Sequence, residues 1–133
     1  MRSQQSGFLL IEGLIAILIF SFGILALVAL QAVVVKEVGE AKFRMEATQF
    51  ANQLIGQMWA DDKLTLSINY ASPDGSRYTQ WKDEVVAANS LPGAATKPPT
   101  VVFNGSNQVT VSIFWKQPGA DVAHEYVVIT QLQ

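Results

Sequence analysis

The sequence has 133 residues, half of them hydrophobic, and it contains no cysteine. The length allows one small domain beside a membrane segment, and the lack of cysteine excludes disulfide bonds and thiolate chemistry. Residues 61–133 carry five basic and seven acidic side chains, a net charge of −2. This part of the chain has no general electrostatic attraction for nucleic acid, so we expect no nucleic-acid partner.

The first element is a long apolar run that follows a short polar start. From Phe8 to Val35 the only polar side chains are Glu12, Ser21 and Gln31. A helix of this length would measure about 42 Å, which exceeds the roughly 30 Å of a bilayer's hydrocarbon core. The run is too long for a cleaved secretory signal, and no site of the Ala-x-Ala kind follows it. The pattern therefore predicts one membrane-spanning helix over residues 8–35.

A plain membrane anchor explains the length of this run but does not explain Glu12. A charged side chain inside a bilayer costs about 2.5–3.5 kcal/mol on insertion scales, and such residues usually have a function and a partner. Glu12 is therefore the first candidate functional residue.

The stretch GFLLIEGLIAILIF closely resembles the N-terminal signature of type IV pilins and pseudopilins. That signature is a short basic leader ending in Gly, then Phe, then an apolar helix whose fifth residue is Glu. Gly7 matches the residue before the prepilin peptidase cut, and Phe8 matches the N-methylated first residue of the mature chain. Glu12 matches the fifth-position glutamate, whereas Leu9 stands where the family usually has Thr or Ser. The resemblance implies that residues 1–7 are a leader peptide.

The family also implies a partner for the carboxylate. In a growing filament, the glutamate of an incoming subunit pairs with the terminal amine of its neighbour, so Glu12 is expected to be an assembly residue that meets the amine of Phe8 in another subunit. A pair within one chain is also possible, because residues four apart share one face of a helix. Opposite charges attract strongly where the dielectric constant is low, and such a pair can fix the axial register of apolar helices.

Two further stretches resemble minor pilins of the PilV type. Gly23 and Gln31 stand where these proteins have Gly and Gln, and Trp81 followed by Leu91-Pro92-Gly93 resembles the segment before their sheet. Major pilins usually have a helix-kinking proline in the apolar helix, and this chain has none before Pro73. The glycines are compatible either with local melting of the helix or with close packing of neighbouring helices.

After Val35 the apolar pattern becomes one-sided. Apolar residues recur at steps of three and four, and they are Phe43, Ala47, Phe50, Ala51, Leu54, Ile55 and Met58. Such a stripe is typical of a helix that packs on a domain core. The pattern predicts one continuous helix from about Phe8 to Trp59, with residues 36–60 as its amphipathic half.

The C-terminal domain, residues 61–133, is expected to be small and mixed. Helical spacing predicts a helix within 77–93 that Pro92-Gly93 closes. The stretch TVVFNGSNQVTVSIFW predicts a hairpin that turns at Asn104-Gly105, with the alternating residues Val109, Val111 and Ile113 on one buried face. Residues 124–132 predict a third strand. The expected fold class is α+β: a long N-terminal helix, with a membrane half and an amphipathic half, packed on a small three-stranded antiparallel sheet.

The sequence offers little for catalysis. His124 is the only histidine, and beside Glu125 we expect it to be a solvent-exposed residue. No Gly-x-Ser-x-Gly elbow, phosphate-binding glycine loop or zinc-ligand spacing occurs. Asp61 and Asp62 are two adjacent carboxylates without further ligands, so we interpret them as a solvated turn and not as a calcium site. We expect no enzymatic activity, no metal and no cofactor.

The resemblance implies a minor pilin that is incorporated at low abundance into a type IV pilus. Its partners would be the major pilin, other minor pilins, the prepilin peptidase and the inner-membrane assembly platform. It would first span the bacterial inner membrane once, with the basic end around Arg2 inside and the C-terminal domain in the periplasm, and later reach the cell surface in the filament. Two alternatives stay open: a minor pseudopilin of a type II secretion system, and a filament-borne adhesin or DNA-uptake subunit.

Overall fold

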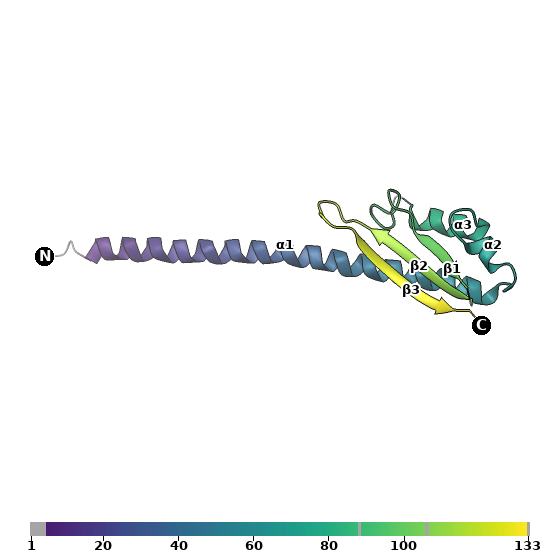
Figure 1. Ribbon diagram of the computed structural model, residues 1–133. Helices are drawn as coiled ribbons and strands as arrows, with labels where there is room; N and C mark the ends of the chain where they lie inside the picture. Colours follow the sequence, from purple (N-terminus) through teal and green to yellow (C-terminus); the bar gives the residue numbers. More distant parts are fainter. Residues whose placement is uncertain (1–4, 88, 106, 133) are drawn as a thin grey trace. The chain divides into compact units, whose positions relative to one another are not determined.

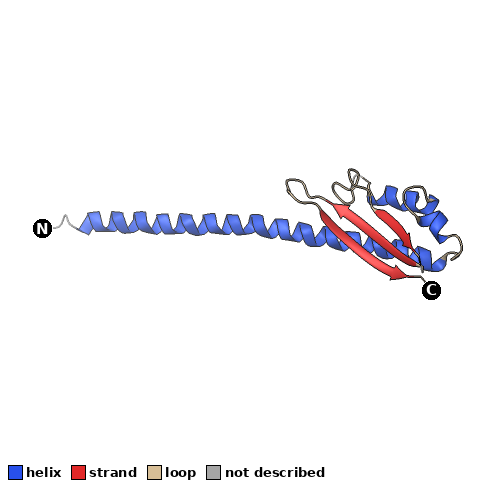
Figure 2. Ribbon diagram, viewed as in Figure 1, coloured by secondary structure: helices blue, strands red, loops and turns tan. Residues whose placement is uncertain are grey.

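The computed structural model describes residues 5–87, 89–105 and 107–132 (Figure 1). Its elements, in chain order, are α1 (Gln5–Ala60), α2 (Leu66–Tyr70), α3 (Ser76–Val85), β1 (Thr100–Asn104), β2 (Gln108–Trp115) and β3 (His124–Gln131). The chain divides into two units, Met1–Gly39 and Glu40–Gln133, and α1 belongs to both. The predicted α+β fold, with a long N-terminal helix and a three-stranded antiparallel sheet, is confirmed (Figure 2).

The first unit consists of the apolar part of α1. Every large hydrophobic side chain from Phe8 to Val38 is between 47% and 73% exposed, so this helix presents an apolar surface on all sides. A helix of that kind is stable only inside a membrane or a larger assembly. It is the one described helix that is long and apolar enough to cross a membrane.

The second unit is built around the amphipathic half of α1. Its buried residues Ala47, Ala51, Leu54 and Met58 belong to the same core cluster as the inward side chains of the sheet. Phe43 and Phe50 lie at the border of that cluster and are only partly buried. The predicted stripe is therefore confirmed, and its centre is the line of residues 47, 51, 54 and 58.

The sheet has the strand order β1-β2-β3 with antiparallel pairing throughout. The predicted buried face of β2, with Val109, Val111 and Ile113, is confirmed, and in the second half of the strand Ser112 and Phe114 on the opposite face are buried as well. β2 is the central strand, and the ammonium group of Lys97 lies 3.5 Å from the centre of the Phe114 ring on the outer face. Strict alternation holds only where one face of a strand is open to solvent.

The hairpin between β1 and β2 is confirmed, but its turn is longer than the Asn-Gly pair suggests. Asn104 pairs with Gln108, so three residues separate the paired strands, and of these Ser106 lies outside the described residues. The left-handed conformation is found at Asn107, with φ of 57°. A three-residue loop whose last residue is left-handed is the next commonest hairpin connection after the two-residue turns, and asparagine tolerates that conformation well.

The helix predicted within 77–93 ends earlier than expected, at Val85. The following segment, of which Ala88 lies outside the described residues, carries Leu91 and Ala94 into the core. The Lys116 N–H donates to the Pro92 carbonyl at 2.7 Å, and Gly93 takes a positive φ of 77° beside Lys116. The helix does not continue past Val85 because the residues after it make these contacts at the end of β2.

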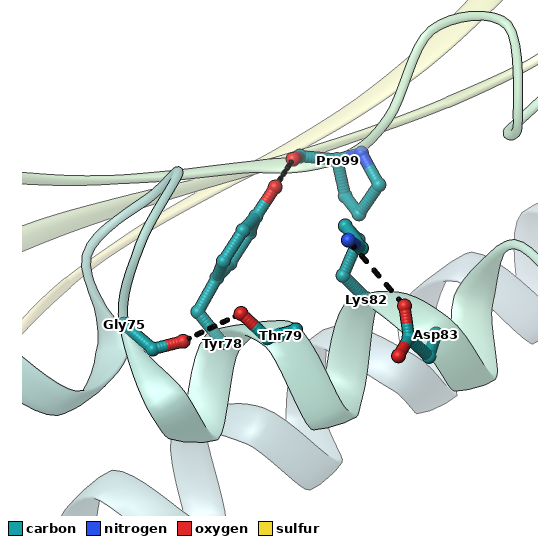
Figure 3. A network of polar contacts seen from close by, with 6 residues as sticks. All are labelled: Gly75, Tyr78, Thr79, Lys82, Asp83 and Pro99. Carbon is teal, nitrogen blue, oxygen red and sulfur yellow. Dashed lines mark hydrogen bonds and ion pairs between the residues drawn. The ribbon is translucent and has the colours of Figure 1, made fainter.

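Two buried side chains fasten α3 to the rest of the second unit. The Trp81 indole N–H donates to the Phe50 carbonyl of α1 at 2.9 Å. The Tyr78 hydroxyl donates to the Pro99 carbonyl at 2.7 Å, just before β1 (Figure 3). Both side chains also lie in the core cluster, so α3 is held by packing and by hydrogen bonds that have little access to water.

We expect the Tyr78→Phe variant to be less stable by about 1–3 kcal/mol, because it leaves the Pro99 carbonyl without its buried donor. Burial raises the pKa of Tyr78 above its usual 10.0. Above about pH 10 the unfolded chain therefore ionises first, and the stability that is present at lower pH is lost. Tyr78→Phe should weaken this alkaline loss but not remove it, since burial also raises the pKa of Tyr70. Urea unfolding at pH 7, 10 and 11 measures both effects, and an unchanged alkaline slope would contradict the role of Tyr78.

Candidate functional site

The three residues singled out by the sequence, Gly7, Phe8 and Glu12, all lie on α1 within the first unit. The helix begins at Gln5, so the Gly7–Phe8 bond lies in its first turns. Phe8 is 70% exposed, and apart from the nearby helical backbone no described atom lies within 4 Å of the place where a Cβ on Gly7 would stand. Among the described residues, no other side chain therefore packs against this part of α1.

Glu12 is exposed, and it has no partner among the residues that the structure describes. Within the described residues, its carboxylate makes neither a hydrogen bond nor an ion pair. By contrast, the Ser21 hydroxyl donates to the Ile17 carbonyl of the same helix at 2.7 Å, so that polar group is satisfied inside the helix. The side chains around Glu12 on α1 are apolar and exposed, with Phe8 one turn before it and Ile15 one turn after. Inside a bilayer, a carboxylate in such surroundings is costly unless it finds a partner.

His124, in the second unit, is not the fully exposed residue that we expected. Its side chain is 31% exposed, its ring stacks on Trp115 with centroids 5.7 Å apart, and its Nε2 lies 3.3 Å from Oε1 of Glu40. These contacts tie the first residue of β3 to α1 and to the neighbouring strand. Neither a serine nor a threonine hydroxyl bonds to His124 among the described residues, so the geometry assigns it a packing role.

The adjacent carboxylates Asp61 and Asp62 close the end of α1. The Asp62 N–H donates to Asp61 Oδ1 at 2.9 Å, and the Leu64 N–H donates to Asp62 Oδ1 at 3.0 Å. The bond from the Asp62 N–H, together with a bond from the Tyr70 hydroxyl, holds the pKa of Asp61 below its usual value. The interpretation of these residues as a turn is confirmed. No cluster of three or more His, Cys, Asp or Glu residues suited to a metal ion occurs in the part of the chain that the structure describes.

One polar hollow beside this turn was not predicted from the sequence. It is open, with a volume of about 240 Å³, and Gln57, Ala60, Asp61, Tyr70 and Arg77 line it. Tyr70 enters it from α2, a five-residue helix that is too short for a periodic signal. Within it, the Tyr70 hydroxyl donates to Asp61 Oδ2 at 3.0 Å.

Neither family models, nor curated proteins, nor solved structures gave a match to this chain. The candidate site therefore rests on the residues of the first unit, and the fold rests on the helix and sheet described above.

Proposed function

We propose that this protein is a minor pilin of a type IV pilus. The observation that carries the proposal is Glu12: a carboxylate without a partner among the described residues, surrounded by exposed apolar side chains and five residues after Gly7. The resemblance of residues 7–20 to the pilin signature supplies the missing partner, the amine of Phe8 in a neighbouring subunit. The long helix and small antiparallel sheet are compatible with a pilin-like architecture.

The proposed sequence of events begins in the bacterial inner membrane. The apolar half of α1 spans the bilayer once, with Arg2 on the cytoplasmic side and the C-terminal domain in the periplasm. The prepilin peptidase cuts after Gly7 and leaves a charged amine on Phe8, which is then methylated. The methyl group keeps the amine basic, so the positive charge that Glu12 needs is retained.

During assembly, the apolar part of α1 moves from the membrane into the core of the filament. The exposed apolar side chains of α1 pack against the same region of other minor pilins and of the major pilin. The Glu12 carboxylate pairs with the Phe8 amine of a neighbour in surroundings where water is excluded, so the two charges attract strongly. Van der Waals packing alone lets apolar helices slide past each other, whereas a single charge pair favours one axial register.

The test of the proposal is the N-terminus of the mature protein. We expect mass spectrometry of protein taken from cells with an active peptidase to show a chain that begins at Phe8 and carries one extra methyl group. The Gly7→Arg variant should remain uncut, because a large charged side chain then fills the open space beside the scissile bond. Gly56→Arg is the matched control, since Gly56 is an exposed glycine of the same helix with no atom near it, and it should be cut normally. Retention of Met1 in the wild type would refute the pilin assignment.

A deletion of the gene separates this proposal from the pseudopilin of a secretion system, which has the same N-terminal signature. Loss of surface pili and of twitching motility, with normal secretion of exoproteins, supports the minor pilin. Loss of exoprotein secretion with normal pili would support the pseudopilin. Piliated cells that fail only in attachment or DNA uptake would support the adhesin or uptake subunit.

A further inference from the structure

The two edge strands of the sheet, β1 and β3, differ in how far their outer backbone groups are hydrogen-bonded. At the outer side of β1, Ser72 acts as a short substitute for a neighbouring strand. Its N–H donates to the Val101 carbonyl at 3.0 Å, and the Val101 N–H donates to its Oγ at 3.2 Å. On the other side of the sheet, β3 has β2 as its single neighbour (Figure 1). The β1 edge is therefore closed in its middle, and β3 is the open edge.

The β3 edge is long and regular. Its register with β2 is unbroken over eight consecutive pairs, from Trp115 with His124 to Gln108 with Gln131. For residues 124–130, the described part of the chain holds no backbone hydrogen bond beyond the pairing with β2. In an antiparallel edge strand, the N–H and C=O groups of alternate residues point away from the neighbouring strand. These groups form a row that only another extended chain can satisfy together.

The strand also lacks the usual protection against such pairing. Edge strands of native proteins are commonly guarded by lysine, proline, a bulge or short length. β3 contains no lysine, arginine, proline or glycine, and its outward side chains are Glu125, Val127, Ile129 and Gln131. Val127 is 46% exposed and Ile129 is 59% exposed. An edge of this composition is open to pairing with another extended chain.

We infer that the β3 edge binds an extended strand of another protein, one that carries β-branched residues and a lysine or arginine opposite Glu125. The backbone row requires an extended chain, and the exposed pair Val127 and Ile129 favours β-branched neighbours. Glu125 is the only acidic residue of the strand, so a cation across from it completes the match. A second copy of β3 fits less well, because it brings another Glu125 and neither lysine nor arginine. This inference does not depend on the pilin assignment.

The test uses the full chain in detergent micelles and three fluorescein-labelled peptides. The first has eight residues, alternating valine and threonine with one central lysine; the second has glutamate in place of the lysine; the third has two prolines at alternate central positions. We expect fluorescence anisotropy to show binding of the lysine peptide, about two- to fivefold weaker binding of the glutamate peptide, as one cross-strand charge pair implies, and no binding of the proline peptide.

Three variants at exposed positions give the decisive comparison. Glu125→Lys should reverse the preference so that the glutamate peptide binds more tightly, a result that a loss of folding cannot produce. Ile129→Lys places a guarding lysine on the edge and should remove binding. Val102→Lys is the matched control, because Val102 is 48% exposed on the same outer face but lies on β1, and it should bind as the wild type does. Equal binding of the lysine and proline peptides would overturn the inference. Concentration-dependent dimerisation without peptide that Ile129→Lys abolishes would also overturn it, since the edge would then belong to a second copy.

Discussion

The Glu12→Gln variant will be cut and inserted like the wild type but will be nearly absent from surface filaments. Glutamine keeps the shape of the side chain and removes the charge that meets the Phe8 amine of the neighbour. Removing one partner of a buried ion pair costs about 3–5 kcal/mol, because the other charge remains buried and unpaired. If that cost falls on incorporation, the ratio of filament to membrane protein drops by roughly 100-fold or more. The measurement is this ratio in sheared filaments and in inner membranes.

Three companion variants separate assembly from insertion. Glu12→Ala removes an unfavourable polar group from the bilayer, so it should insert at least as well as the wild type and still fail to assemble. Glu12→Asp keeps the charge on a shorter stem and should be intermediate. Glu37→Gln is the matched control, because Glu37 is an exposed glutamate of the same helix that lies beyond the apolar run, and it should assemble normally. Equal incorporation of the wild type and Glu12→Gln would contradict the charge-pairing mechanism, and it is the result that a plain membrane anchor predicts.

The parts of the fold that follow from local chemistry were predictable from the sequence. An unbroken apolar run followed by apolar residues at steps of three and four predicts one helix from about Phe8 to Trp59, and the observed helix α1 is continuous over Gln5–Ala60. The β-branched run of residues 124–132 likewise gives β3. In both cases the residues specify their own conformation, and the packing of the core agrees with it.

The errors come from contacts that local patterns do not contain. The helix α3 ends at Val85 because the following segment packs against the end of β2. There the Pro92 carbonyl accepts a hydrogen bond from the Lys116 N–H. β2 is buried on both faces at Phe114 because Lys97, seventeen residues earlier, covers the ring. His124 is half-buried because Glu40, far away in the sequence, lies beside it. None of these neighbours is visible in a window of ten or fifteen residues.

For the candidate site, the sequence is more informative than the structure. The sequence singles out Gly7, Phe8 and Glu12 by their order and spacing, and the structure adds only that Glu12 has no partner within residues 5–87, 89–105 and 107–132. The reason is physical: the proposed partner is the amine of another subunit, and it forms only after cleavage. An isolated, uncut chain cannot display that contact.

The second large effect concerns the core of the second unit, where Leu54→Ala should destabilise the fold by about 3–5 kcal/mol. Leu54 is fully buried at the centre of the helical stripe, and a buried leucine replaced by alanine loses its transfer free energy and leaves a cavity. Met45→Ala is the matched control on the same helix, because Met45 is 62% exposed, and it should change stability by less than about 0.5 kcal/mol. Phe50→Ala should fall between them, because Phe50 is only partly buried.

Tryptophan fluorescence during urea unfolding of the full chain in detergent measures all three variants, since Trp81 and Trp115 are buried and become exposed when the second unit unfolds. The expected loss of stability is largest for Leu54→Ala, smaller for Phe50→Ala and smallest for Met45→Ala. This order distinguishes two explanations of the apolar stripe. If the stripe packs on the sheet of its own chain, the cost follows burial within the chain and does not change with dilution. If it were an interface with other subunits, Leu54→Ala and Met45→Ala would differ little in dilute protein, and the cost would appear only when the chain assembles. Because Leu54 belongs to the same core cluster as Val111 and Ile113 of β2, the first pattern is the expected one.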